Sequence, residues 1–139
     1  MTSSANDQWQ EAIVQLANSG TQDNIALMPS AAYTTTQTSA DQTNPNARGV
    51  VVVLDMTIVG TGSVTLTIKG KDPVSGKYYT ILAGVAVTTN STNIYRVYPG
   101  LTAAANATAS DVMPRTWQVV VTANNANSAT YSVGAMLIL

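Results

Sequence analysis

The stretch from Ser63 to Leu82, SVTLTIKGKDPVSGKYYTIL, contains two apolar runs on either side of a polar turn. In the first run Val64, Leu66 and Ile68 alternate with hydroxyl and lysine side chains, as in a strand with one buried and one wet face. The second run, KYYTIL, is rich in aromatic and β-branched residues, which also favours a strand. Two strands this close in sequence predict a β-hairpin.

The glycines of the same stretch raise the alternative of a phosphate-binding loop. That loop needs four residues between its glycines, then a lysine and a hydroxyl residue, and it leads into a helix. Here five residues separate Gly70 from Gly76, and Lys77 is followed by Tyr78. We therefore interpret the stretch as a hairpin turn that Asp72 opens, in which Gly76 adopts a positive φ without steric cost.

The period-two pattern continues over the rest of the chain from Ile25 onward, with turn residues between most of the runs. This predicts an all-β domain over residues 25–139, an antiparallel β-sandwich or a jelly-roll-like barrel. The candidate strands are residues 24–29, 31–38, 48–59, 63–71, 77–88, 93–100, 116–124 and 129–139.

Two of these runs, GVVVVLDM (49–56) and GAMLIL (134–139), are apolar on both faces. Such runs belong either to central strands or to an interface between chains. The last run ends at Leu139, and a free apolar edge there would be prone to aggregation. We expect this strand to be buried in the sandwich or covered by a neighbouring subunit. The Thr-, Asn- and Ala-rich segments 34–46 and 103–110 are expected to be exposed loops or partner contacts.

Residues 1–24 form a separate N-terminal arm in this interpretation. The segment 6–19, NDQWQEAIVQLANS, has the spacing of an amphipathic helix, with Trp9, Ile13 and Leu16 on one stripe. An isolated helix of this length is marginal in water, so the stripe should pack on something. It packs either on its own domain or on a partner, and Trp9, Ile13 and Leu16 are the candidate partner-binding residues.

The composition excludes several classes of function. The chain has no histidine and no cysteine, which removes imidazole bases, thiol nucleophiles and the usual zinc ligands. Charged residues make up 9% of the chain and the net charge is −1, so no basic surface for nucleic acid or an anionic membrane is expected. The sequence shows no secretory signal, no membrane-spanning run and no cofactor motif.

The carboxylates show no spacing typical of a paired acid and base, and a hydrolase with a pair drawn from distant strands is a remote alternative. Asp55 is unusual because it lies within an apolar strand. We expect it to face outward or to form an ion pair with Arg48, Arg96 or Arg115, in preference to a functional role.

Two sets of polar residues also have a functional alternative. The six tyrosines are expected in the core and at its rim, with a sugar-binding surface as the alternative. The amides of Asn124, Asn125 and Asn127 are expected to stabilise a turn and not to bind calcium. The tyrosines are Tyr33, Tyr78, Tyr79, Tyr95, Tyr98 and Tyr131.

Five segments taken in order resemble a widespread group of small proteins from the structural gene modules of tailed bacteriophages. They are SADQTNPNARGVVVVLD, GKDPVSGKYYTIL, YRVYPGL, PRTWQVVVTA and ATYSVGAMLIL. The likeness covers about residues 30 to 139 and contains no catalytic motif. Residues 1–29 depart from it and look like an extension.

The resemblance implies a non-enzymatic virion protein that decorates or stabilises a capsid. Such a protein is expected to contact a phage capsid or another virion protein and to form a homo-oligomer, without nucleic acid or membrane as a partner. The alternative is a tail- or fibre-associated module that binds host glycans. A virion component of either kind needs a rigid β scaffold and self-complementary surfaces.

Overall fold

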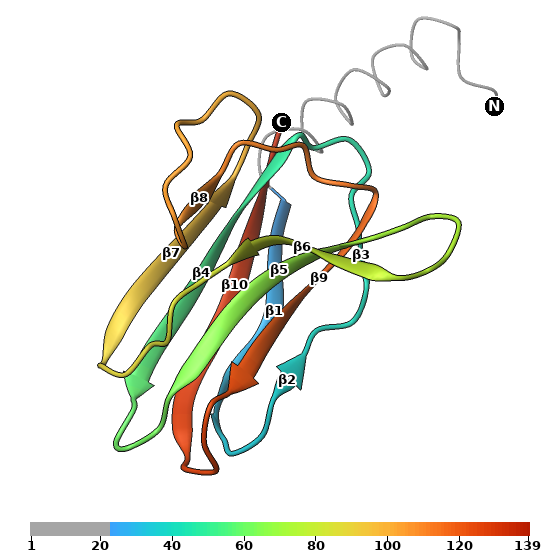
Figure 1. Ribbon diagram of the computed structural model, residues 1–139. Helices are drawn as coiled ribbons and strands as arrows, with labels where there is room; N and C mark the ends of the chain where they lie inside the picture. The colour runs from blue at the N-terminus through green and yellow to red at the C-terminus, as the bar shows by residue number, and fades with distance from the viewer. Residues whose placement is uncertain (1–22) are drawn as a thin grey trace, which may run out of the picture.

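The computed structural model describes residues 23–139, which form two β-sheets packed face to face (Figure 1). Sheet 1 has the strand order β1-β10-β4-β7-β8, and sheet 2 has the order β2-β9-β5-β6 with β3 also paired to β9. The strands are β1 (Asp23–Tyr33), β2 (Gln37–Thr38), β3 (Gln42–Thr43), β4 (Gly49–Ile58), β5 (Val64–Lys71), β6 (Tyr78–Ala83), β7 (Ser91–Val97), β8 (Thr108–Ala109), β9 (Thr116–Ala123) and β10 (Ala129–Ile138).

The chain passes repeatedly from one sheet to the other, and only the steps β2–β3, β5–β6 and β7–β8 stay within one sheet. Strand β10 lies between β1 and β4, and β9 lies between β2 and β5. This is the order of a jelly roll, in which two four-stranded sheets interleave along the sequence. The pairings are antiparallel except that β8 runs parallel to β7. The predicted all-β sandwich is confirmed for the described residues.

The core lies between the sheets and takes alternate side chains from each strand. Val52 and Leu54 of sheet 1 and Leu66, Trp117 and Val119 of sheet 2 have no exposed surface. In β5 the buried positions are those of the predicted apolar alternation. Burial of apolar surface at about 25 cal/mol per Å² is the main force that joins the two sheets.

The hairpin predicted from the opening stretch is β5–β6, which reaches away from the body of the sandwich in Figure 1. The backbone N–H of Asp72 donates to Lys77 O at 2.8 Å, and that of Gly76 donates to Asp72 O at 2.9 Å. The Ser75 hydroxyl donates to the Asp72 carboxylate at 2.6 Å, and Gly76 has a φ of 73°. The turn assignment is therefore confirmed.

Two strand boundaries differ from the predicted ones. The runs 24–29 and 31–38 were predicted as separate strands, whereas β1 continues through Pro29 to Tyr33. The register shift between Met28 and Ala31 accommodates the proline, and β1 is an edge strand, where proline is tolerated. The run 77–88 was predicted as one strand, but β6 ends at Ala83.

The two segments expected to be loops contain short strands. Strands β2 and β3 pair with β9 inside the segment 34–46, and β8 pairs with β7 inside 103–110. Asn44 is buried, and its side-chain Nδ2 donates to Ala47 O at 2.7 Å. The segment 34–46 is thus fixed along the edge of sheet 2 by hydrogen bonds.

The two strands that are apolar on both faces, β4 and β10, lie inside sheet 1 and pair with each other. The expected central position is confirmed, and alternate residues of β10 are buried in the core. Within residues 23–139 there is no helix, and none that could cross a membrane. The predicted helix over 6–19 lies outside the described residues.

Candidate functional site

The outer face of sheet 1 is the most apolar exposed surface that the strand alternation creates. Even-numbered residues of β10 and odd-numbered residues of β4 point away from the core. Val53 pairs with Gly134 of β10 on one side and with Ile94 of β7 on the other. The Ile94 side chain is 42% exposed. Sheet 1 therefore presents an apolar row that runs across its strands at the level of Val53.

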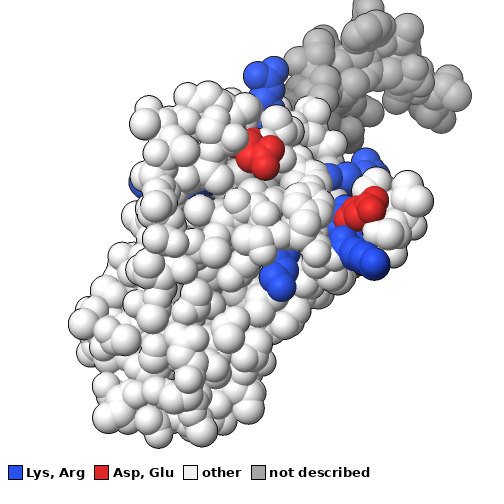
Figure 2. Space-filling view, in the orientation of Figure 1, with Lys and Arg blue, Asp and Glu red and all other residues white. Residues whose placement is uncertain are grey.

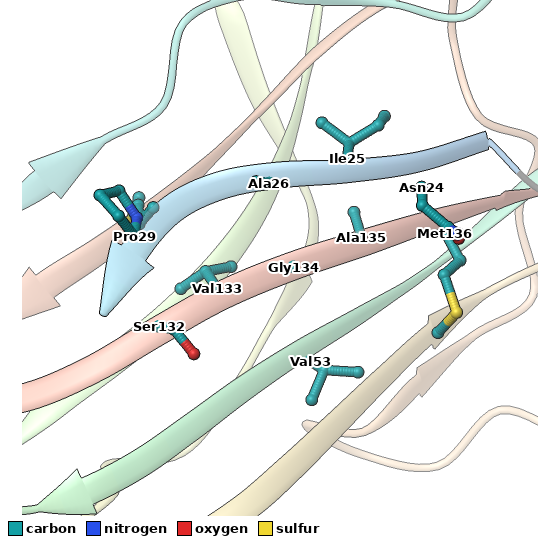
Figure 3. A pocket seen from close by; sticks show the side chains of 11 residues that line it. Asn24, Ile25, Ala26, Pro29, Val53, Ser132, Val133, Gly134, Ala135 and Met136 are labelled. Atoms are coloured by element: carbon teal, nitrogen blue, oxygen red, sulfur yellow. The ribbon is translucent and has the colours of Figure 1, made fainter.

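A shallow groove of about 670 Å³ lies on this face over β1, β10 and β4. Figure 3 shows Val53, Ser132 and Met136 directed to one side of the sheet and Ile25 and Ala135 to the other. The lining residues are Asn24, Ile25, Ala26, Met28, Pro29, Val53, Ser132, Val133, Gly134, Ala135 and Met136. Ser132 and Met136 flank Gly134, which has no side chain to fill the space between them.

Asp55 and Arg96 carry charges of opposite sign on the same face. Asp55 pairs with Thr92 across β4 and β7, and Arg96 pairs with Val51. The Thr92 hydroxyl donates to Asp55 Oδ1 at 3.2 Å. The expectation that Asp55 faces outward agrees with its half-buried position in the alternation of β4. The expected ion pair with Arg48, Arg96 or Arg115 does not form among residues 23–139.

A second polar cluster lies where the β5–β6 hairpin meets the segment 34–46. Lys71 Nζ contacts Asp41 Oδ2 at 2.9 Å, and the Tyr78 hydroxyl donates to Asp41 Oδ1 at 2.7 Å. Lys71 Nζ also lies 5.4 Å from the centre of the Tyr78 ring, a cation–π arrangement. This cluster joins two segments that are 30 residues or more apart in sequence.

The cluster shifts the titration of its three members. The hydrogen bond from Tyr78, followed by the one from Lys71, lowers the pKa of the Asp41 carboxyl. The hydrogen bond to Asp41 raises the pKa of Lys71 and that of Tyr78. All three groups are solvent-exposed, so water and salt weaken these interactions. They favour a charged and hydrogen-bonded cluster at neutral pH, without a group held ready to transfer a proton.

The charged residues are unevenly distributed over the face of sheet 2. Figure 2 shows Lys, Arg and Asp side chains gathered toward the end that carries the hairpin, while the opposite end of this face has none among the described residues. Asp72 is at the hairpin tip, where the hydrogen bond from Ser75 lowers its pKa. No cluster of carboxylates able to hold a metal ion occurs in the part of the chain that is described.

The tyrosines divide between the core and the rim, as expected. Tyr95 and Tyr131 are buried, and the ring of Tyr33 packs against that of Tyr131 with 4.8 Å between their centroids and 38° between their planes. Burial raises the pKa of Tyr131 to about 12. Tyr78 and Tyr79 are 41% and 47% exposed. Because they are adjacent in a strand they point to opposite faces, so they do not form one stacking surface.

The asparagines after β9 stabilise the adjoining turns. Asn125 Nδ2 donates to Thr61 O at 2.9 Å, and Asn127 Nδ2 donates to the same oxygen at 3.3 Å. Asn124 Nδ2 donates to the hydroxyls of Ser63 and Thr65, both at 3.0 Å. The predicted turn role of these amides is confirmed.

The candidate partner-binding residues Trp9, Ile13 and Leu16 lie outside the described residues. The sequence analysis named Arg96 only as a partner for Asp55, and it did not single out Gly134. The alternation of Tyr95 and Val97 around Arg96 was a signal that Arg96 faces outward.

Comparison with known proteins yields a distant likeness to a solved structure. No protein-family model matches the chain, and no curated protein matches it. One similar solved structure is described as "Bacillus endospore appendages form a novel family of disulfide-linked pili". It is 17% identical, the match covers 85% of this chain and 87% of that one, and the TM-score is 0.46. A likeness at this identity and TM-score carries no conclusion about the function of this chain.

Proposed function

We propose that this protein is a non-enzymatic structural protein of a tailed-phage virion that decorates or stabilises the capsid. The observation that supports this most strongly is the outer face of sheet 1, where Val51, Val53 and Ile94 point away from the core. Apolar rows of this kind mark surfaces that a partner covers. The class of partner, a phage capsid or another virion protein, is taken from the resemblance to phage structural proteins.

Two further features support a structural role. The jelly-roll order is found in viral capsid domains, although it also occurs in lectins, so the fold alone does not separate the two. The polar clusters of the described domain are used in its own turns and loops, as at Asp41 and Asn125. A rigid scaffold with a self-complementary surface is what a particle subunit needs.

The direct test is binding of the full-length chain to phage heads that lack their own copy. We expect saturable co-sedimentation with a fixed number of chains per head, because a decoration protein occupies repeated lattice positions. Isolated tails serve as the comparison. Binding to tails but not to heads would favour the alternative, a tail- or fibre-associated module. No binding to either particle would overturn the virion proposal.

The N-terminal arm is proposed to attach the domain to the particle through Trp9, Ile13 and Leu16. A buried tryptophan at such a contact contributes several kcal/mol, so Trp9→Ala should weaken head binding measurably. Gln10→Ala is the matched control, since it changes a neighbouring polar residue of the same segment. Unchanged head binding by a variant with alanine at all three positions would contradict the attachment role.

The alternative function is a tail- or fibre-associated module that binds host glycans. One observation favours it: the exposed Tyr78 ring lies beside the Asp41 carboxylate, and an aromatic ring next to a carboxylate suits a sugar. Tyr79, which is also exposed, faces the other way, so the site would be small. Binding of host surface polysaccharide that is lost in Tyr78→Ala and retained in Tyr79→Ala would favour this function.

A further inference from the structure

The outer face of sheet 1 has a charge pattern with a simple symmetry. In the register of β4 with β7, Val53 pairs with Ile94. Asp55 lies two residues from this row along β4, and Arg96 lies two residues from it along β7, on the opposite side. At about 3.3 Å per residue, Asp55 and Arg96 of one chain are about 13 Å apart along the strands. They are too distant to pair with each other.

We propose that this face binds a second copy of the chain face to face. The two-fold axis would lie in the interface, parallel to the sheet, and run across β4 and β7 along the row of Val53 and Ile94. Such an axis exchanges the two ends of the face. Asp55 of each copy then lies near Arg96 of its partner, and the Val53–Ile94 row of one copy packs on that of the other. The inference rests on the proposed function, because the outer face of sheet 1 supports that function and the inference names the partner that binds this face.

The side chains of the face fit this arrangement. Its centre is apolar, with Val53 and Ile94 on adjacent strands, while Asp55 lies at one end and Arg96 at the other, beside Val51. Apolar centres with charged or polar rims are typical of interfaces between protein chains. The charges select the second copy as the occupant, since a surface with a carboxylate at one end and a guanidinium at the other complements itself when it is turned by a half circle.

Asp55 and Arg96 also lack an ionic partner within the described part of the chain. The only ion pair formed among residues 23–139 joins Lys71 to Asp41. Asp55 is half-buried in the alternation of β4 and accepts one hydrogen bond, from Thr92. The hydrogen bond from Thr92 is exposed to solvent, and Arg96 of a second copy would place an opposite charge beside Asp55.

The test is a charge exchange in the full-length protein. We expect the wild type to sediment at micromolar concentration as a species of twice the 14.5 kDa chain mass. Asp55→Lys sets the introduced lysine against Arg96, and Arg96→Glu sets the introduced glutamate against Asp55. Each contact occurs twice in a two-fold dimer, so each single variant should raise the dimer Kd about 100-fold.

Mixing the two single variants distinguishes a contact between chains from an effect within one chain. In a mixed dimer Asp55 of one chain still meets Arg96 of the other, and the introduced lysine meets the introduced glutamate. We expect the mixture, and the double variant alone, to dimerise with nearly the wild-type Kd. Lys69→Glu on sheet 2 and Asp111→Lys in a loop make the same charge changes elsewhere and should leave the Kd unchanged.

Several outcomes would overturn this contact. A monomeric wild type, or single variants with unchanged Kd, would remove it. If the single variants dimerise weakly and mixing them does not restore the wild-type Kd, the substitutions act within one chain and not across an interface. Dimerisation that appears only after residues 1–22 are deleted would mean that the chain's own N-terminal segment covers the face. These measurements use pure protein without phage heads, so they leave the outcome of the head-binding test independent.

Discussion

Replacing Gly76 in the β5–β6 turn tests the part of the structure from which the fold was first inferred. Gly76 has a φ of 73°, which costs a residue with a Cβ atom about 1–2 kcal/mol and costs a β-branched residue at least as much. A Cβ atom at this position would meet only Lys71 Cε, at 3.9 Å, which is ordinary van der Waals contact. The loss of stability therefore comes from backbone strain and not from a clash.

We expect Gly76→Val to lower the free energy of unfolding by about 2 kcal/mol, Gly76→Ala by about 1 kcal/mol, and Gly76→Asn least, because asparagine tolerates the left-handed region. Urea unfolding followed by circular dichroism measures this order, provided that the m-value stays constant. Experiments should be run at one protein concentration, since the proposed dimerisation would contribute to the apparent stability. Equal stability of Gly76→Val and Gly76→Asn would refute the assignment of the turn.

Gly49 provides the matched contrast because its constraint is steric. A Cβ atom there would lie close to the Val97 carbonyl oxygen and 2.6 Å from the Tyr98 ring, so something must shift to admit it. Here even Gly49→Ala should destabilise the protein, and Gly49→Asn should be worse than Gly49→Ala. The order of the two substitutions is thus reversed between Gly76 and Gly49.

Three further outcomes follow from the described contacts and from the proposed role of the arm. Tyr131→Phe should raise the free energy of unfolding by about 1 kcal/mol at pH 7, because the buried Tyr131 hydroxyl has no hydrogen-bond partner within residues 23–139. The same variant should lose less stability between about pH 10 and 12, where the wild type must ionise that hydroxyl on unfolding; equal alkaline titrations would contradict this. Asp41→Asn should cost a little stability at neutral pH and nothing below the folded pKa of Asp41, since a lowered carboxyl pKa gives stability that is present above about pH 4 and lost in acid; urea midpoints at pH 2.5 and 7 measure it. Trp9→Ala should reduce head binding and leave the melting temperature of the β domain within about 2 °C of the wild-type value. A large fall in the melting temperature would indicate that the segment packs on its own domain and is not an attachment arm.

The local features of the sequence predicted most of the fold. The alternation of Val64, Leu66 and Ile68 gave the buried face of β5, and the turn residues around Gly76 gave the hairpin. These signals are reliable because strand alternation and turn geometry depend on near neighbours along the chain. Doubly apolar runs likewise indicated central strands, and β4 and β10 are central.

The features that were missed depend on contacts between distant segments. Pro29 was taken as the end of a strand, yet β1 passes through it because the partner strand β10 allows a register shift there. Gly84 ends β6 where the backbone approaches Tyr95 and the Leu66 carbonyl oxygen. Nothing in the local sequence around Asp41 indicates that Lys71 and Tyr78 will meet it, since that contact follows from the docking of the segment 34–46 along sheet 2.

The candidate interface was also only partly predictable from the sequence. Asp55 was recognisable in the sequence as a charge inside an apolar strand, and Arg96 was among its suggested partners. What the sequence lacked was the register that pairs Val53 with Ile94 and so places the two charges on opposite sides of one row. That register separates Asp55 from Arg96 within one chain. In the proposed two-fold dimer the same two residues would meet between copies, and the charge-exchange mixture measures whether they do.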